Sequence, residues 1–154
     1  MVRYKEISDR HREQLLAARG TIVVSRGNVH HLKDLPGYIA EDAAGNILGM
    51  IFYALADEEC EIVALNSYRQ GAGIGTTLIN LVKERLQAGP YKRMWLITTN
   101  DNIHAIRFYQ KRGFDMKCIH RHAVHEARLV KPSIPLVSDE GIPIQHEIEF
   151  EMIL

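Results

Sequence analysis

The chain has 154 residues, of which 46% are hydrophobic and 25% are charged. This length suits one domain with its own core, and the mix excludes disordered and collagen-like chains. The 19 basic residues balance the 19 acidic ones. Because no basic stripe or polybasic patch is present, neither a nucleic-acid binder nor a membrane-surface protein is expected. We therefore expect a single domain over residues 1–154.

The cysteines and the polar start of the chain indicate a cytoplasmic protein. Cys60 and Cys118 lie far apart and form neither a disulfide framework nor a CxxC zinc motif, so we expect two reduced thiols. Residues 1–6 lack the apolar core of a signal peptide. The longest apolar stretch, residues 47–56, is much shorter than the roughly 20 residues that cross a membrane.

The first half of the chain is predicted to contain one helix and four strands. Residues 2–7 read as a strand, and residues 8–19 read as a helix that Ser8 or Asp9 caps. Residues 21–35 give a weak signal, and we expect a second short helix or a loop there. Strands are then predicted at residues 37–42, 47–57 and 61–66, the first two joined by a turn at Gly45 and Asn46, which tolerate positive φ.

The second half alternates helices and strands. After a glycine-rich turn at residues 71–75, the predicted elements are helix 76–88, strand 93–98, helix 102–112, strand 114–122, helix 123–130, a proline-containing loop at 131–143 and strand 144–153. The last strand alternates Ile148, Phe150 and Met152 with three glutamates. Consecutive strands with interspersed helices indicate an α+β domain with a mixed sheet.

The glycine-rich turn follows a strand and opens a helix, which is the setting of a phosphate-binding loop. A helix N-terminus carries unpaired N–H groups and partial positive charge, and glycines let a ligand approach the backbone. The Walker pattern is excluded because no lysine precedes Thr76 or Thr77. The Rossmann pattern is excluded because Thr76 occupies the place of its last glycine.

The turn resembles the pyrophosphate loop of the GNAT acetyltransferase superfamily, (Q/R)xxGx(G/A). Gln70, Gly73 and Gly75 match its fixed positions. A second GNAT-like segment lies one helix and one strand further on, with an Asn that opens a helix, a Phe-Tyr pair near its end and a Gly-Phe start of the next strand. Its matching residues are Asn102, Ala105, Phe108, Tyr109, Gly113 and Phe114. The likeness covers residues 47–114 well, and the part after His122 looks like an uncharacterised bacterial branch.

The resemblance implies a GNAT fold of the α/β class (α+β type). Its sheet is mixed and mostly antiparallel, has about seven strands and helices on both faces, and is split between the fourth and fifth strands, here 61–66 and 93–98. It also implies acetyl-CoA as cosubstrate, with the pantetheine arm in the split. The residues expected to bind the cofactor are Leu65, Asn66, Gln70, Gly71, Ala72, Gly73, Ile74, Gly75, Thr76, Asn102 and Phe108. Asn102 is expected to contact the pantetheine arm, to cap its helix, or to do both.

The resemblance also suggests catalytic residues for acetyl transfer to an amine. Tyr109 is the candidate acid for the thiolate, because a phenol stays protonated at neutral pH; the alternative is a packing residue. Glu61 is the candidate base; the alternative is an exposed carboxylate beside the acidic residues 57–59. A backbone N–H near Leu65 or Asn66 would stabilise the oxyanion. Arg69, Arg107 and Lys111 are candidates for the nucleotide 3′-phosphate, or else solvated surface residues.

The eight histidines do not form a recognisable metal motif. His30 and His31 are adjacent, so on a strand they would face opposite sides. His120 and His122 alternate on a predicted strand with His125 nearby, and no carboxylate or cysteine completes a ligand set. We therefore expect no metal, and His120, His122 and His125 are candidates for the acceptor side.

The acceptor, a small-molecule or peptide amine, is not identified. Asp139 and Glu140 in the proline-containing loop could attract a cationic amine or form a solvated turn. The alternative to an enzyme is a sensor that binds acyl-CoA without turnover, and the missing Walker lysine disfavours a nucleotide-binding regulator. The alternating final strand is expected at a sheet edge, from which a homodimer follows as a hypothesis.

Overall fold

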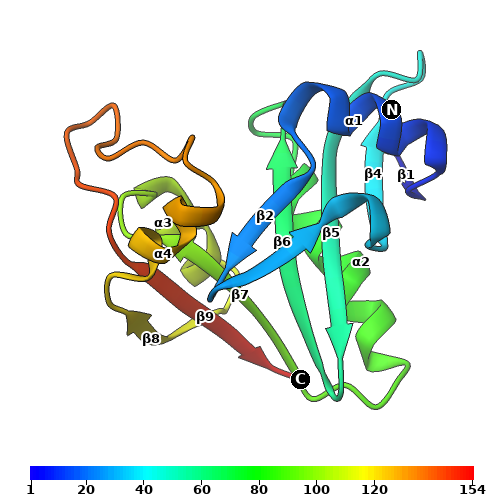
Figure 1. Ribbon diagram of the computed structural model, residues 1–154. Helices are drawn as coiled ribbons and strands as arrows, with labels where there is room; N and C mark the ends of the chain where they lie inside the picture. The colour runs from blue at the N-terminus through cyan, green and yellow to red at the C-terminus, as the bar shows by residue number, and fades with distance from the viewer.

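A seven-stranded sheet in the order β1-β4-β5-β6-β7-β9-β8 organises the chain (Figure 1). The computed structural model describes residues 1–154. The strands of this sheet are β1 (Arg3–Glu6), β4 (Gly37–Glu41), β5 (Ile47–Ala56), β6 (Glu59–Ser67), β7 (Arg93–Thr99), β8 (Asp115–His120) and β9 (Glu147–Ile153). Only the β6–β7 pair is parallel. The prediction of a mixed, mostly antiparallel seven-stranded sheet is confirmed.

Helices cover both faces of the sheet, as expected. They are α1 (Asp9–Arg19), α2 (Ile74–Gln87), α3 (Ile103–Lys111) and α4 (Ala123–Val130). The larger core lies under α2, where Leu78 and Val82 pack on Ile62 and Leu96. A smaller core on the other face places Leu15 of α1 with its neighbours Leu32, Ile39, Met50 and Phe52. None of the helices is both long and apolar enough to cross a membrane.

Residues 21–35 form a β-hairpin, so the prediction of a short helix or loop there is wrong. Strands β2 (Ile22–Ser25) and β3 (Asn28–His31) pair with each other and lie outside the large sheet. The turn residues Arg26 and Gly27 have φ values of 49° and 77°, the left-handed pair that a two-residue hairpin turn requires. The β-branched run at 22–24 and this Gly were the available signals. A 3₁₀ helix (Leu32–Asp34) follows.

The sheet splits between β6 and β7, as the resemblance implied. In the β5–β6 ladder Phe52 pairs with Ala64 and Tyr53 with Ile62, which leaves Val63 as an extra residue. Such a bulge bends its strand. On its other side β6 pairs with β7 only as far as Ile62 and Leu96. Beyond that point the two strands diverge and their facing backbone edges are unpaired.

Two expectations for the C-terminal part are wrong. Strand β8 ends at His120, and His122 adopts φ 60° as the N-cap of α4, so His120 and His122 do not share a strand face. Strand β9 lies between β7 and β8 and is not an edge, which removes the support for the dimer hypothesis. It begins at Glu147 rather than at residue 144, because the amides of residues 145 and 146 donate to the Asn100 side chain.

Candidate active site

The loop between β6 and α2 is an open cradle of backbone amides. Gly71 and Gly73 have φ values of 75° and 69°, and no side chain caps α2 or adds acidic charge to its first turn. The N–H groups of residues 71–76 donate to no protein acceptor, and a Cβ added at Gly71 or Gly73 would meet no atom within 4 Å. Together with the positive helix N-terminus, these groups suit an anion such as a phosphate.

A cleft of about 770 Å³ joins this cradle to the split in the sheet. Its walls carry no carboxylate but five permanently cationic side chains, which are Arg19, Arg69, Arg107, Lys111 and Arg112. A cleft lined by one sign of charge attracts ligands of the opposite sign. The cleft therefore suits an elongated, strongly anionic ligand.

Most of the residues expected to bind the cofactor line this cleft. They are Leu65, Asn66, Gln70, Gly71, Gly73, Ile74, Gly75, Thr76, Asn102 and Phe108, together with Tyr109. Ala72 belongs to the same loop, but the structure does not bring it to the cleft wall.

The β6 wall of the cleft offers unused hydrogen-bonding groups. Leu65 and Asn66 pair with Ile51 and Met50 of β5, and their edge toward β7 has no partner strand. The Oδ1 atom of Asn66 is buried without a hydrogen-bond partner. Because buried polar groups are normally paired, this edge and this amide fit a ligand with amide groups of its own, as pantetheine has.

Helix α3 supplies the opposite wall. Asn102 caps it by accepting a hydrogen bond from the amide of Ala105 at 3.1 Å, which confirms the capping prediction. Phe108 packs so closely on α2 that a Cβ at Gly75 would lie 3.0 Å from its ring, which explains the glycine. Arg112 lies over the Phe108 ring and donates to Thr76 Oγ1 at 3.0 Å, so it connects α3 to the amide cradle.

Tyr109 is buried among aromatic rings beside the cleft. Its ring contacts Phe108, Phe114 and Phe150 at centroid distances of 5.3 to 6.1 Å, so the packing interpretation holds for the ring. Its hydroxyl has no protein hydrogen-bond partner, and burial raises the pKa of the phenol. The group therefore stays protonated through the neutral range.

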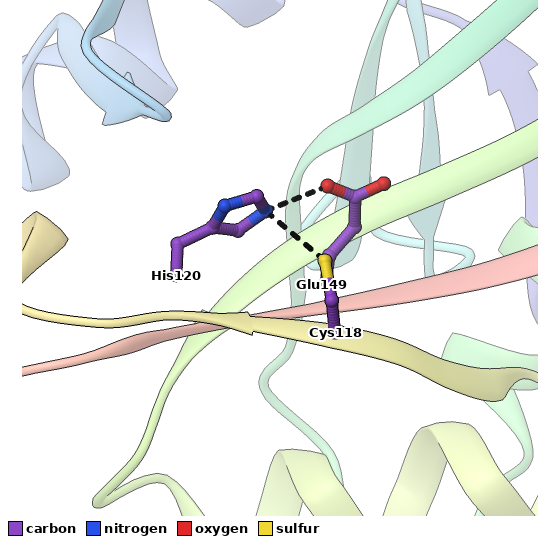
Figure 2. Close-up of side chains that lie close together, drawn as sticks. All are labelled: Cys118, His120 and Glu149. Atoms are coloured by element: carbon purple, nitrogen blue, oxygen red, sulfur yellow. Dashed lines mark hydrogen bonds and ion pairs between the residues drawn. The ribbon is translucent and has the colours of Figure 1, made fainter.

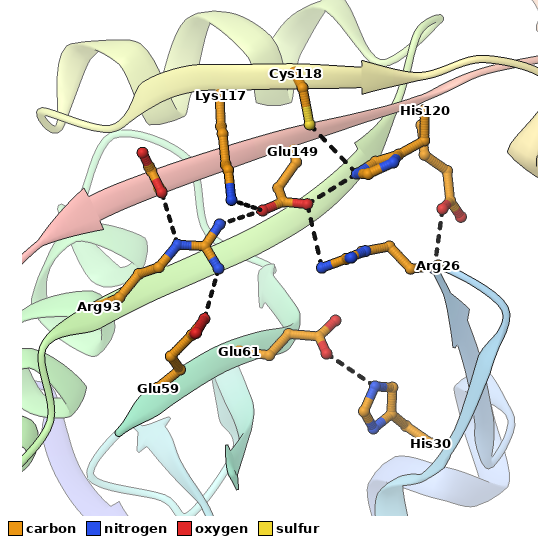
Figure 3. A network of polar contacts seen from close by, with 11 residues as sticks. Arg26, His30, Glu59, Glu61, Arg93, Lys117, Cys118, His120 and Glu149 are labelled. Carbon is orange, nitrogen blue, oxygen red and sulfur yellow. Dashed lines mark hydrogen bonds and ion pairs between the residues drawn. The ribbon is translucent and has the colours of Figure 1, made fainter. Parts of the chain in front are cut away.

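Glu61 lies on the other face of the sheet, one residue before the split opens. It is only 6% exposed, so its interpretation as an exposed carboxylate is wrong. Its Oε1 lies 3.0 Å from Nε2 of His30 on β3 (Figure 3). This hydrogen bond raises the pKa of His30. Tyr109 therefore lines the cleft, whereas Glu61 does not and lies on the opposite face of the sheet.

Glu61 and its partner His30 lie beside a network of polar contacts that joins the hairpin to β6, β7, β8 and β9, and we call the pair and the network together the charge cluster (Figure 3). Its members are Arg26, His30, Glu59, Glu61, Arg93, Lys117, His120, Glu147, Glu149 and Glu151. Sequence reasoning missed most of them, because the hairpin that brings Arg26 and His30 over the sheet was not predicted. The glutamates at 147, 149 and 151 were the available signal, as three charges on one face of a strand.

Cys118, His120 and Glu149 meet within this cluster (Figure 2). His120 Nε2 lies 2.8 Å from Glu149 Oε1 and 3.5 Å from Cys118 Sγ. Because both contacts use the same ring nitrogen, the three do not form a thiol–imidazole–carboxylate relay. Glu149 is also paired with Arg26, Arg93 and Lys117, and these charges would repel a divalent cation.

The other histidines proposed for the acceptor side lie elsewhere. His122 and His125 gather with His146 at centroid distances of 4.9 and 5.4 Å from the His122 ring, and His122 and His125 are exposed. Only His120 joins the charge cluster. On β3, His30 and His31 face opposite sides, as predicted, and His31 is exposed.

Comparison with known proteins supports a GNAT assignment. The model of the "Acetyltransferase (GNAT) family" matches residues 4–114. The chain is 40% identical over 133 residues to the uncharacterised Bacillus subtilis protein YdhI, covering 86% of this chain and 82% of that one.

Two solved structures share the fold. An IAA acetyltransferase from Bacillus cereus has a TM-score of 0.74 at 19% identity, with all of both chains covered. A Bacillus subtilis acetyltransferase in complex with CoA has a TM-score of 0.71 at 16% identity, covering 100% of this chain and 99% of that one. From its matched sequence, its split sheet and its amide cradle, we conclude that the chain belongs to the GNAT family of acetyltransferases.

Proposed function

We propose that residues 1–154 act as one N-acetyltransferase domain that transfers the acetyl group of acetyl-CoA directly to an amine. The observation that carries this proposal is the cationic cleft, which continues from a free amide cradle into the split between β6 and β7. A diphosphate fits the cradle, and a chain with amide groups fits the unpaired edge at Leu65 and Asn66. A protein with the same fold has been solved in complex with CoA, which supports CoA as the ligand of this proposal.

In this proposal the charges of the cofactor are matched along the cleft. The amides of residues 71–76 bind the diphosphate, and Arg112, which bridges α3 and the cradle, adds positive charge beside it. Arg69, Arg107 and Lys111 lie on the cleft wall and are the candidates for the 3′-phosphate. Acetyl-CoA supplies the activated acetyl thioester.

The two catalytic candidates act from opposite faces. Glu61 accepts the proton of the attacking amine, and the amine nitrogen forms a bond to the thioester carbonyl carbon. A backbone N–H near Leu65 stabilises the oxyanion. When the carbon–sulfur bond breaks, Tyr109 donates its proton to the thiolate, a donation that its protonated state allows. Exchange with solvent returns Glu61 and Tyr109 to their starting states.

Replacement of Tyr109 by Phe tests the proposal. Because the ring contacts remain, we expect unchanged affinity for acetyl-CoA, while kcat falls by about 10²-fold or more, the usual effect of losing a general acid. Calorimetry measures the affinity, and thiol release with a panel of amines measures kcat. A wild-type protein that binds acetyl-CoA but releases no thiol with any amine would instead support the acyl-CoA sensor.

A further inference from the structure

The face of the sheet opposite the helices α2 and α3 carries buried charge that the proposed acetyl transfer uses only in part. Glu61, Glu147 and Glu149 lie on this face and are 6%, 2% and 1% exposed. The hairpin β2–β3 lies over them and forms contacts through Arg26 and His30 (Figure 3). If Glu61 accepts the proton of the amine, as proposed above, the acceptor must enter here.

The charge cluster is acidic. It contains five glutamates but only three permanently charged cations, Arg26, Arg93 and Lys117. Two negative charges are therefore in excess when His30 and His120 are neutral. Lys131, the other nearby cation, is bound to the carbonyl oxygen of Ile22, at the opposite end of the hairpin from its turn.

Glu147 is the member of the cluster with the least compensation. Its Oε1 accepts a hydrogen bond from the Arg26 amide at 3.0 Å, and its second oxygen accepts none. Burial raises the pKa of its carboxyl, and the nearby negative charge of Glu61 adds to this effect. A buried carboxylate in this state would gain from a cation placed beside it.

Ser25 adds a second acceptor without a partner. It is 3% exposed, and its Oγ has no hydrogen-bond partner. In the hairpin Val23 pairs with His30 and Ser25 with Asn28. Because side chains alternate along a strand, Ser25 shares the hairpin face of His30, which contacts Glu61. The Ser25 side chain therefore lies on the hairpin face that is turned toward Glu61 and the sheet.

This face of the sheet already binds cationic groups of its own chain. The Arg26 guanidinium lies 5.4 Å from the Trp95 ring centroid and 3.4 Å from Glu149. The His30 imidazole is hydrogen-bonded to Glu61. The hairpin is not hydrogen-bonded to the large sheet. It can therefore move aside without breaking a sheet ladder, and an incoming cation can replace its side chains.

We propose that the acceptor site lies between the β2–β3 hairpin and the sheet, and that it takes a cationic amine with two positive groups. One ammonium group replaces His30 at Glu61, gives one proton to Glu61 and attacks the thioester carbonyl as the neutral amine. It releases its second proton to solvent as the amide forms, and CoA leaves as the thiol that Tyr109 protonates. The second cationic group binds Glu147 and the Ser25 hydroxyl. This inference rests on the proposed function and adds the chemical class of the acceptor.

Three acceptors of equal chain length test the inference, namely 1,5-diaminopentane, n-pentylamine and 5-aminopentanoate. Each offers the same unhindered primary amine, and they differ in a second ammonium, a methyl or a carboxylate at the far end. We expect kcat/KM to be highest for the diamine and lowest for the amino acid, with about tenfold or more between the first two, as for a hydrogen-bonded charge. Calorimetry with the CoA-saturated protein should give the same order of affinity.

Variants separate the acceptor site from general effects of charge. Ser25→Ala and Glu147→Gln should each remove most of the preference for the diamine over n-pentylamine. Ser25→Ala should do so without loss of stability, because no protein group uses the hydroxyl. Asp139→Asn, in the exposed loop, is the matched control and should keep the full preference.

Equal or greater activity with 5-aminopentanoate would overturn the inference, as would the absence of diamine binding to the CoA-saturated protein. A preference that survives both Ser25→Ala and Glu147→Gln but is lost in Asp139→Asn would assign cation recognition to the loop. Failure of acetyl-CoA itself to bind would contradict the proposed function instead, and the titration reports that result separately.

Discussion

Tyr109 and Glu61 are both buried, but their surroundings differ. Tyr109 lies among apolar rings, which raise the pKa of the phenol and leave its hydroxyl free. Glu61 lies in a polar network, with one oxygen held by His30. These surroundings suit a proton donor on one face of the split and a proton acceptor on the other.

Replacing Glu61 by Gln should lower kcat by about 10²-fold or more near neutral pH, because the amine then has no base. The loss should shrink as pH rises, because a growing share of the amine arrives already neutral. The pH profile of kcat checks this. Glu58→Gln changes an exposed glutamate of the preceding turn and should match the wild type. A loss that is the same at every pH would argue against the base role.

At the scale of single residues, the sequence allowed local interactions to be predicted, but not contacts between residues that are far apart in the chain. Asn102 could be assigned as a helix cap because its effect reaches only three residues along the chain. The contact of His30 with Glu61 spans 31 residues and depends on a hairpin that was not predicted. The buried state of Glu61 was missed for the same reason.

The glycine-rich loop can bind an anion because Gly71 and Gly73 take left-handed conformations and the backbone amides of the loop have no protein acceptor. Gly73→Ala should cost about 1 kcal/mol in the free energy of unfolding, since its φ is 69°. It should also weaken acetyl-CoA binding, because its methyl group enters the open cradle. Gly45→Ala is the matched control, with φ 85° and open space in a distant turn.

Chemical denaturation and calorimetry separate the two effects. Both variants should lose similar stability, but only Gly73→Ala should lose affinity for acetyl-CoA. Equal affinities of the two variants would mean that the cradle does not hold the cofactor.

The hairpin β2–β3 should be held to the sheet in a pH-dependent way. The hydrogen bond to Glu61 raises the pKa of His30. Its stabilising effect is therefore complete below about pH 6.5, the ordinary value for histidine, and is lost as pH rises through the raised pKa. We expect His30→Gln to lower the free energy of unfolding by about 1–2 kcal/mol at pH 6.

Urea denaturation at pH 6 and at pH 9 measures this difference. The difference in the free energy of unfolding between His30→Gln and the wild type should be smaller at pH 9 than at pH 6. His31→Gln, on the outer face of the same strand, should show no such dependence. A difference in the free energy of unfolding that widens with pH would contradict the raised pKa of His30.

At the scale of elements, regular patterns predicted most of the sheet. The alternation of β9 and the apolar face of α2 gave their positions to within a few residues. The order of the strands was less accessible, because nothing local in residues 147–153 shows that they lie between β7 and β8. For that reason the prediction that the last strand lies at an edge of the sheet was wrong.

Across the whole molecule, a balanced composition conceals separated charges. The formal net charge is zero, yet the cleft beside α2 and α3 gathers five permanent cations without a carboxylate, and the opposite face gathers five glutamates in the charge cluster. Composition could not reveal this, because the fold sorts the side chains by face. The separation matches an anionic cofactor on one side and a cationic acceptor on the other.

The central claim is that the amide cradle holds the diphosphate of acetyl-CoA and the β6–β7 split holds its arm. A map of backbone amide chemical shifts during titration with acetyl-CoA tests this most directly. The account predicts that the largest shifts occur at residues 71–76, with further shifts at residues 63–66. Shifts confined to other parts of the chain, or none at all, would contradict it.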